Sequence, residues 1–189
     1  MDIKINYINS FFSLLRNHAV FTLCCILFML VLPMIFEYKI LQILYSVFAM
    51  IIAFNVIFSC SWSIGNKHRR NVKIFNRKLE EQGEPTIKHN CYSGLIIAGI
   101  YAVFNIIICI VCFILSHSDT NWISIVGNLV YKFWFAPFIF CFIYIVRLQY
   151  LLWFMVAITP SVPIILGYIN GIKGIKPFEG FINKLVYKN

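Results

Sequence analysis

Charged residues are scarce in this sequence, and acidic residues are the scarcest. Charged side chains make up 12% of the 189 residues, and Asp and Glu together number 7. An ordinary soluble domain carries about twice that charged fraction, roughly 25%. With 61% of its residues hydrophobic, a soluble fold of this length would expose large apolar patches, which promote aggregation. The composition therefore excludes an ordinary soluble domain and predicts an all-α integral membrane protein.

The residue sets that carry most enzyme chemistry are missing as well. The sequence has no glycine-rich phosphate loop, no Ser-His-Asp set and no pair of carboxylates inside an apolar run. Seven cysteines are an odd count without extracellular spacing, which argues against a disulfide framework. The histidines lie in loops or near expected span ends and lack partners at metal-ligand spacing: His18, His68, His89 and His117. We therefore predict a non-enzymatic protein with no catalytic residue, metal or cofactor.

A few polar or small residues do lie within the apolar runs. Cys109 and Cys112 form a C-x-x-C pair whose thiols share one helix face, but apolar surroundings disfavour the reactive thiolate, so we expect a packing role. Gly94 and Gly99 are five residues apart and do not match the G-x-x-x-G spacing of packed membrane helices. Three asparagines are expected to form hydrogen bonds between helices: Asn55, Asn105 and Asn128.

Apolar runs close to the length that a bilayer requires, about 20 residues, predict four transmembrane helices. The segment before the first run has apolar residues at helical spacing over residues 1–16. It is either an amphipathic interfacial helix or a helical extension of the first span. The four expected spans are 18–36, 40–62, 91–115 and 148–169.

The segment 123–146 admits two interpretations. As a fifth span it would place Lys132 near the middle of the bilayer, at a cost of about 2.5–3.5 kcal/mol. Alternatively, the apolar stretch 133–146, which Pro137 interrupts, is short enough to be re-entrant or interfacial. We predict four spans plus one such segment, with five spans as the alternative.

Basic residues are concentrated in the hydrophilic stretch 63–90, which holds seven Lys or Arg against three acids. Lys and Arg accumulate in short loops on the cytoplasmic side. We therefore predict a multi-pass cell-membrane protein with a cytoplasmic loop at 63–90, whose helical part ends at Gly83 and Pro85, and a cytoplasmic N-terminus. The C-terminal tail is also rich in Lys, so we expect it on the same side.

These cations suggest where the protein meets its partners. We predict contacts with anionic lipid headgroups or other anions, and a protein partner at the loop or a second copy of the chain. Nucleic acid is not expected. The leading hypothesis is an accessory or structural subunit of a membrane assembly; the alternative is a small transporter or channel with its pathway near Lys132, Arg147 and the Pro160/Pro163 helix break. The candidate contact residues are Lys67, Arg69, Arg70, Lys73, Arg77, Lys78, Lys132 and Arg147.

Three pieces of the second half carry a family resemblance. They are YSGLIIAGI at the start of the third span, the block YKFWFAPF, and the ending PIILGYINGIKGIKPFEGFINKLVYK. Together they resemble uncharacterised small polytopic membrane proteins of low-GC Gram-positive bacteria. The resemblance implies a bacterial membrane setting and no particular chemistry.

Overall fold

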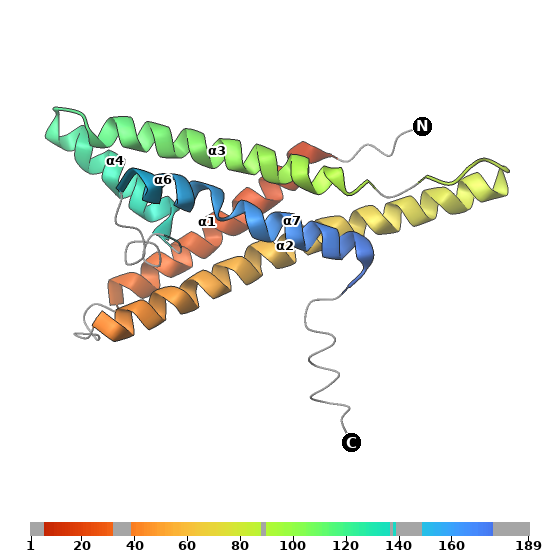
Figure 1. Cartoon of the computed structure of the whole chain (residues 1–189), viewed down its shortest axis with the longest axis horizontal. Helices are drawn as coiled ribbons and strands as arrows, with labels where there is room; N and C mark the ends of the chain where they lie inside the picture. Colours follow the sequence, from red (N-terminus) through yellow and green to blue (C-terminus); the bar gives the residue numbers. More distant parts are fainter. Residues whose placement is uncertain (1–5, 32–38, 88–89, 137, 139–148, 176–189) are drawn as a thin grey trace, which may run out of the picture.

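Helices form every regular element of the part of the chain that the computed structural model describes, which is residues 6–31, 39–87, 90–136, 138 and 149–175 (Figure 1). This confirms the predicted all-α class. In chain order the helices are α1 (Tyr7–Val31), α2 (Lys39–Glu81), α3 (Tyr92–Ser116), α4 (Asn121–Trp134), α6 (Gln149–Ile158) and α7 (Ser161–Lys173).

Among the described residues, three helical segments are long and apolar enough to cross a membrane, one fewer than the four spans expected. The expected span 91–115 corresponds closely to α3. The expected span 18–36 runs past the end of α1 at Val31 into residues outside the described ranges. Because α1 is unbroken from Tyr7, the N-terminal segment is a helical extension of that run. The three segments are Val47–Glu81, Tyr92–Ser116 and Trp153–Lys173.

The stretch 63–90, expected as a loop, is largely helix. α2 continues without a break from Lys39 to Glu81, 43 residues or about 64 Å, roughly twice the thickness of a bilayer core. It ends where predicted, at Gly83, whose φ of 70° is left-handed. The Gly83 amide donates to Glu80 and the Glu84 amide to Leu79, which satisfies the last carbonyls of the helix in a Schellman motif.

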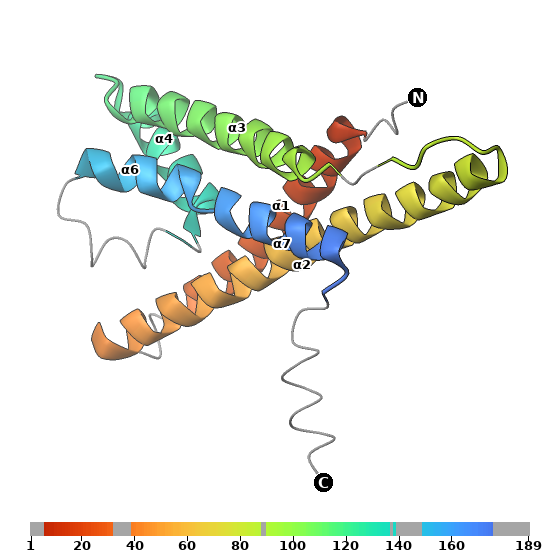
Figure 2. The same ribbon diagram turned by 45° about the vertical axis from the view of Figure 1, so that its right-hand side comes forward.

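The expected span 148–169 falls across two helices in tandem. α6 ends at Ile158 and α7 begins at Ser161, and the break lies at Thr159 and Pro160, where the proline lacks an amide hydrogen. The second proline, Pro163, is accommodated in the first turn of α7. In Figures 1 and 2, α7 runs between α2 and α3, and it contacts both.

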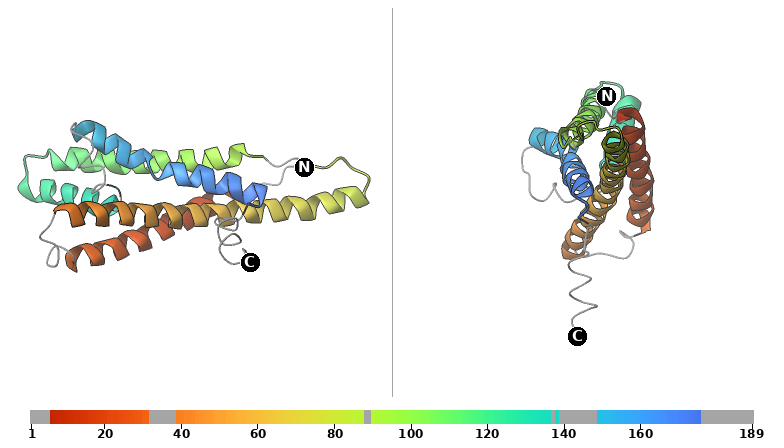
Figure 3. Two further views of the ribbon diagram at one scale, coloured as in Figure 1. Left: turned by 60° about the horizontal axis from the view of Figure 1, so that its bottom comes forward. Right: turned by 90° about the vertical axis from the view of Figure 1, so that its right-hand side faces the viewer.

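α4 turns back from the end of α3 and packs against it, as the side view in Figure 3 shows. Gly127 allows the close approach, since a Cβ there would lie 2.7 Å from the Leu115 side chain. Phe135 and Phe138, which follow α4, are fully buried. Of the ambiguous segment 123–146, the part through Trp134 is therefore a short helix against α3, whereas 139–146 lies outside the described ranges.

Candidate functional site

α2 and α7 form the most extensive contact between described helices, and they approach each other at glycines. A Cβ on Gly171 would lie 2.8 Å from the Asn66 backbone nitrogen and 3.0 Å from the Gly65 Cα. A Cβ on Gly167 would lie 3.1 Å from the Ser61 side chain. Only a residue without a side chain lets the two backbones come this near. We call this contact, formed by Ser61, Gly65, Gly167 and Gly171, the α2–α7 seam.

The sequence itself contains a signal for the seam. Gly167 and Gly171 are four residues apart and form a G-x-x-x-G motif, and Ser61 and Gly65 repeat the small-x-x-x-small spacing on α2. The Ser61 hydroxyl also donates a 2.6 Å hydrogen bond to the Ile164 carbonyl. Such bonds between membrane helices are worth roughly 0.6–2 kcal/mol.

Four helices meet at one level beside the seam. The Tyr168 hydroxyl and His68 Nδ1 share a 2.7 Å hydrogen bond that joins α7 to α2. The Tyr168 ring lies against Gly94 at the start of α3, where a Cβ would come 2.9 Å from the ring Cγ. Ser93 is 3.4 Å from the Tyr7 hydroxyl at the start of α1. We call this level, formed by Tyr7, His68, Ser93, Gly94 and Tyr168, the tyrosine tier.

Side chains of α2 contact the C-terminal end of α7 just beyond the tyrosine tier. The Trp62 indole donates a 2.7 Å hydrogen bond to the Ile175 carbonyl. The Arg69 guanidinium lies against Gly174 and donates a 3.2 Å hydrogen bond to Asn66. A cation is favourable at the C-terminus of a helix, where backbone carbonyls carry partial negative charge. Arg69, expected to contact lipid headgroups, is therefore half-buried and engaged with α7.

Beyond the tier, α2 extends past the other helices (Figure 1). From His68 to Glu81 the helix rises about 20 Å. We call residues 67–81 the basic extension. In the described part of the chain, its exposed cations form no ion pair with an acidic side chain. Within the basic extension, the exposed members of the predicted set are Lys67, Arg70, Lys73, Arg77 and Lys78.

The apolar side of the basic extension is covered by protein. Val72 and Leu79 are 2% and 7% exposed. The returning chain is held against this helix by Asn76, whose amide donates to the Ile87 carbonyl at 3.0 Å and accepts from the Ile87 amide at 2.9 Å. The extension therefore presents its charged side outward, and Ile74, 57% exposed, is the large apolar residue among those cations.

A cluster of polar groups lies inside the bundle. His18 is buried, contrary to its expected place near a boundary; it hydrogen-bonds to the Tyr101 hydroxyl and, at 3.1 Å, to the Trp134 carbonyl. The Trp134 indole donates to Asn105 at 3.0 Å, so Asn105 bonds between helices as predicted. Asn55 and Asn128 instead donate to carbonyls of their own helices: Ile51 and Ser124.

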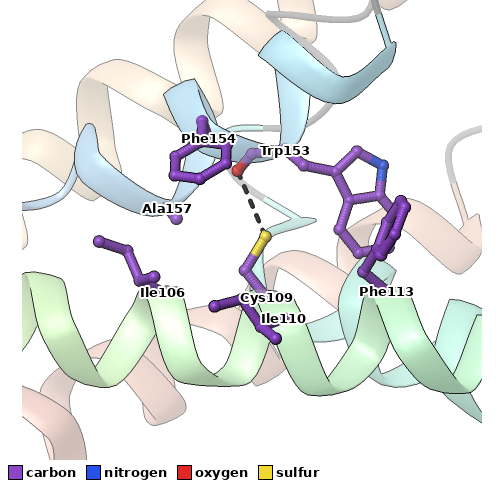
Figure 4. Close-up of a pocket in the computed structure, with 7 residues that line it drawn as sticks. All are labelled: Ile106, Cys109, Ile110, Phe113, Trp153, Phe154 and Ala157. Atoms are coloured by element: carbon purple, nitrogen blue, oxygen red, sulfur yellow. Dashed lines mark hydrogen bonds between the residues drawn. The ribbon is translucent and has the colours of Figure 1, made fainter.

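The two thiols of the C-x-x-C pair are both buried on one face of α3. Cys109 donates a 3.5 Å hydrogen bond to the Trp153 carbonyl beside a cavity of about 150 Å³ between α3 and α6 (Figure 4). Ile106, Phe113 and Ala157 contribute to its apolar lining. No group of three or more potential metal ligands gathers anywhere in the described ranges. A packing role for the thiols stays a prediction.

The remaining candidate residues are not brought together with the basic extension. Lys132 is exposed on α4, and Arg147 lies outside the described ranges. Pro160 and Pro163 are buried at the helix break, away from the cavity lining. No protein-family model, curated protein or solved structure matches the chain. The bacterial family resemblance therefore stays a prediction.

Proposed function

We propose that the chain is a non-enzymatic accessory subunit of a membrane assembly, and that its basic extension docks an acidic partner protein at the membrane face. The observation that carries the proposal is the unbroken course of α2, which moves from an apolar stretch to exposed cations within one helix. A rigid helix holds these cations in a fixed pattern, which suits recognition of a complementary acidic surface.

Distance favours a protein partner over lipid headgroups. Arg77 and Lys78 are nine and ten residues past His68, about 14–15 Å along the helix axis. Attraction to an anionic leaflet falls off within a Debye length, about 8 Å at physiological salt. The extension continues the direction of the membrane helix, so it points away from the bilayer. Lys67 and Arg70, at the level of the tier, lie nearest to the apolar stretch of α2.

Binding of a fluorescent ten-residue polyglutamate peptide to the full-length protein in nanodiscs tests this proposal. We expect salt-sensitive binding that is equal in neutral and anionic nanodiscs, and lost in a variant with Arg77→Glu and Lys78→Glu. Lys132→Glu, an exposed cation on α4, is the matched control and should retain binding. If anionic lipid abolished peptide binding, the cations would be engaged by headgroups and the proposal would fail.

For the membrane topology we propose four spans with the N-terminus, residues 63–90 and the C-terminal tail all in the cytoplasm. Support comes from the tier, which gathers the start of α1, the start of α3 and the last turns of α7 at one level of α2. Reporter fusions after Asn90 and after Asn189 should both report a cytoplasmic location. An external report at the second position would establish an odd number of crossings between them and refute this topology.

The transporter or channel alternative has less support. A pathway needs polar groups along a cavity, and the cavity nearest the helix break is lined by apolar side chains and the Cys109 thiol. Flux of a small anion into proteoliposomes, lost on Lys132→Ala, would favour that alternative over the accessory subunit.

A further inference from the structure

On the side of α2 that faces away from the seam, the exposed residues change from apolar to polar partway along the helix. Up to Ile51 its exposed residues are large and apolar. At the next positions, four residues apart, the exposed residues are Asn55, Ser59 and Ser63. Cations follow on the same side of the helix. The polar residues and these cations together form one face that spans an arc of about 120° around the helix axis. We call it the outward face, formed by Asn55, Ser59, Ser63, Lys67, Arg70 and Arg77.

A second helix with a long exposed side, α3, shows a different surface. α3 presents branched aliphatic side chains at every turn, and Ile100, Ile107 and Ile114 are 40–64% exposed. Lipid chains solvate such side chains well, whereas they offer no hydrogen bond to an amide or a hydroxyl. An open groove of about 520 Å³ between α1 and α2, lined in part by Asn17 of α1 and by Asn55 and Ser59 of α2, adds polar groups at the edge of this face.

Small residues four apart, with an amide nearby, are what membrane helices use to pack closely against one another. The seam uses this spacing on the opposite side of α2, with Ser61 and Gly65 against α7. Ser59 and Ser63 repeat it on the outward face without a helix over them in the described ranges. A further transmembrane helix therefore fits this face.

The positive charge of the outward face indicates which kind of partner helix would bind there. A second copy packed in parallel on this face would bring Lys67 and Arg70 of both chains together, and the net charge of each chain is already +9. A helix followed by acidic residues would meet the same cations favourably. Resting on the proposed function, we propose that the outward face docks a partner's transmembrane helix that carries small or amide residues and continues into an acidic juxtamembrane segment.

Photocrosslinking from two positions of the full-length protein in its native membranes tests this inference. A benzophenone amino acid is placed at Ser59 or at Arg77, with Ile107 on α3 as the lipid-facing control. The adducted peptides are identified by mass spectrometry. We expect both positions to capture one partner chain: a transmembrane segment at the first, and the acidic residues that follow it at the second. Adducts of Ser59 with lipid alone, or with a second copy of this chain, would overturn the inference.

Two variants of Ser63 distinguish failure of this inference from failure of the proposed function. Ser63→Leu blocks close helix approach and should lower the adduct yield at Arg77 about tenfold, the equivalent of about 1.4 kcal/mol, whereas Ser63→Ala should keep it. An acidic partner captured at Arg77 with a yield insensitive to Ser63→Leu would leave the proposed function intact and refute the membrane-helix partner. Capture of no acidic chain at Arg77 would refute both.

Discussion

The two sides of α2 carry the same kind of residue in different surroundings. On the seam side, Ser61 and Gly65 are buried against the glycines of α7. On the outward side, Ser59 and Ser63 have the same four-residue spacing and are exposed. The difference teaches that small-residue spacing alone does not decide whether a helix covers a side of α2; in the described part of the chain, α7 covers one side and leaves the other exposed. Substitutions of graded severity test this comparison.

The largest effect is expected at the centre of the seam. Gly171→Ala places a methyl group against the backbone of α2, which cannot rotate away, and should lower the free energy of unfolding by about 3 kcal/mol. Gly99→Ala is the matched control, because a Cβ there meets nothing within 4 Å. It should be neutral or stabilising by up to about 1 kcal/mol through helix propensity. Titration with SDS in mixed micelles, followed by circular dichroism, measures both. Equal effects at the two glycines would contradict the seam.

A smaller effect is expected at the tier. Tyr168→Phe removes the hydroxyl that bonds to His68 and should lower the free energy of unfolding by about 1–2 kcal/mol. Tyr92→Phe, at a tyrosine that is 73% exposed, should have no effect in the same titration. An unchanged midpoint for Tyr168→Phe would show that the tier is held by ring packing on Gly94 alone.

The sequence predicted the parts of this fold that depend on composition. The bounds of α3 were expected within a residue or two because an uninterrupted apolar run is flanked by polar turns. The length of α2 was missed because charge marks where a membrane surface lies, and the boundary of a helix depends on backbone conformation, here the left-handed Gly83. The apolar stretch and the helix therefore end at different residues of α2.

The contacts of the candidate site were harder to predict because they join distant positions. The burial of His18 was not foreseen because its partners, Tyr101 and Trp134, are 83 and 116 residues away in the sequence. The seam was within reach, since Gly167 and Gly171 show the packing motif in the sequence itself. Which helix lies opposite that motif is set by tertiary packing.

A still smaller loss of stability is expected beside the cavity between α3 and α6. Replacing both Cys109 and Cys112 with Ala beside the 150 Å³ cavity should lower the free energy of unfolding by roughly 1 kcal/mol and leave activity in cells intact. Cys24→Ala, at an exposed thiol, is the control. Loss of cellular activity with normal stability and abundance would show that the thiols do chemistry.

The smallest effect is expected on the outward face. Ser59→Leu should change the free energy of unfolding of the isolated chain by less than about 0.5 kcal/mol, because this side chain is exposed. The same SDS titration measures it, with Ser59→Ala alongside. A loss as large as that of Gly171→Ala would mean that another part of the same chain already covers this face, and the contrast between the two sides of α2 would disappear.

The seam also has a consequence for biosynthesis. The Ser61 hydroxyl and its acceptor, the Ile164 carbonyl, are separated by 103 residues of sequence. A ribosome adds about 5–20 residues per second, so α2 emerges roughly 5–20 s before the helix that fills its small-residue side. During that interval the bare Ser61 and Gly65 side needs a temporary neighbour, either lipid or the insertion machinery. Completion of the seam therefore waits for α7, and a ribosome stalled before α7 leaves both sides of α2 open to other helices.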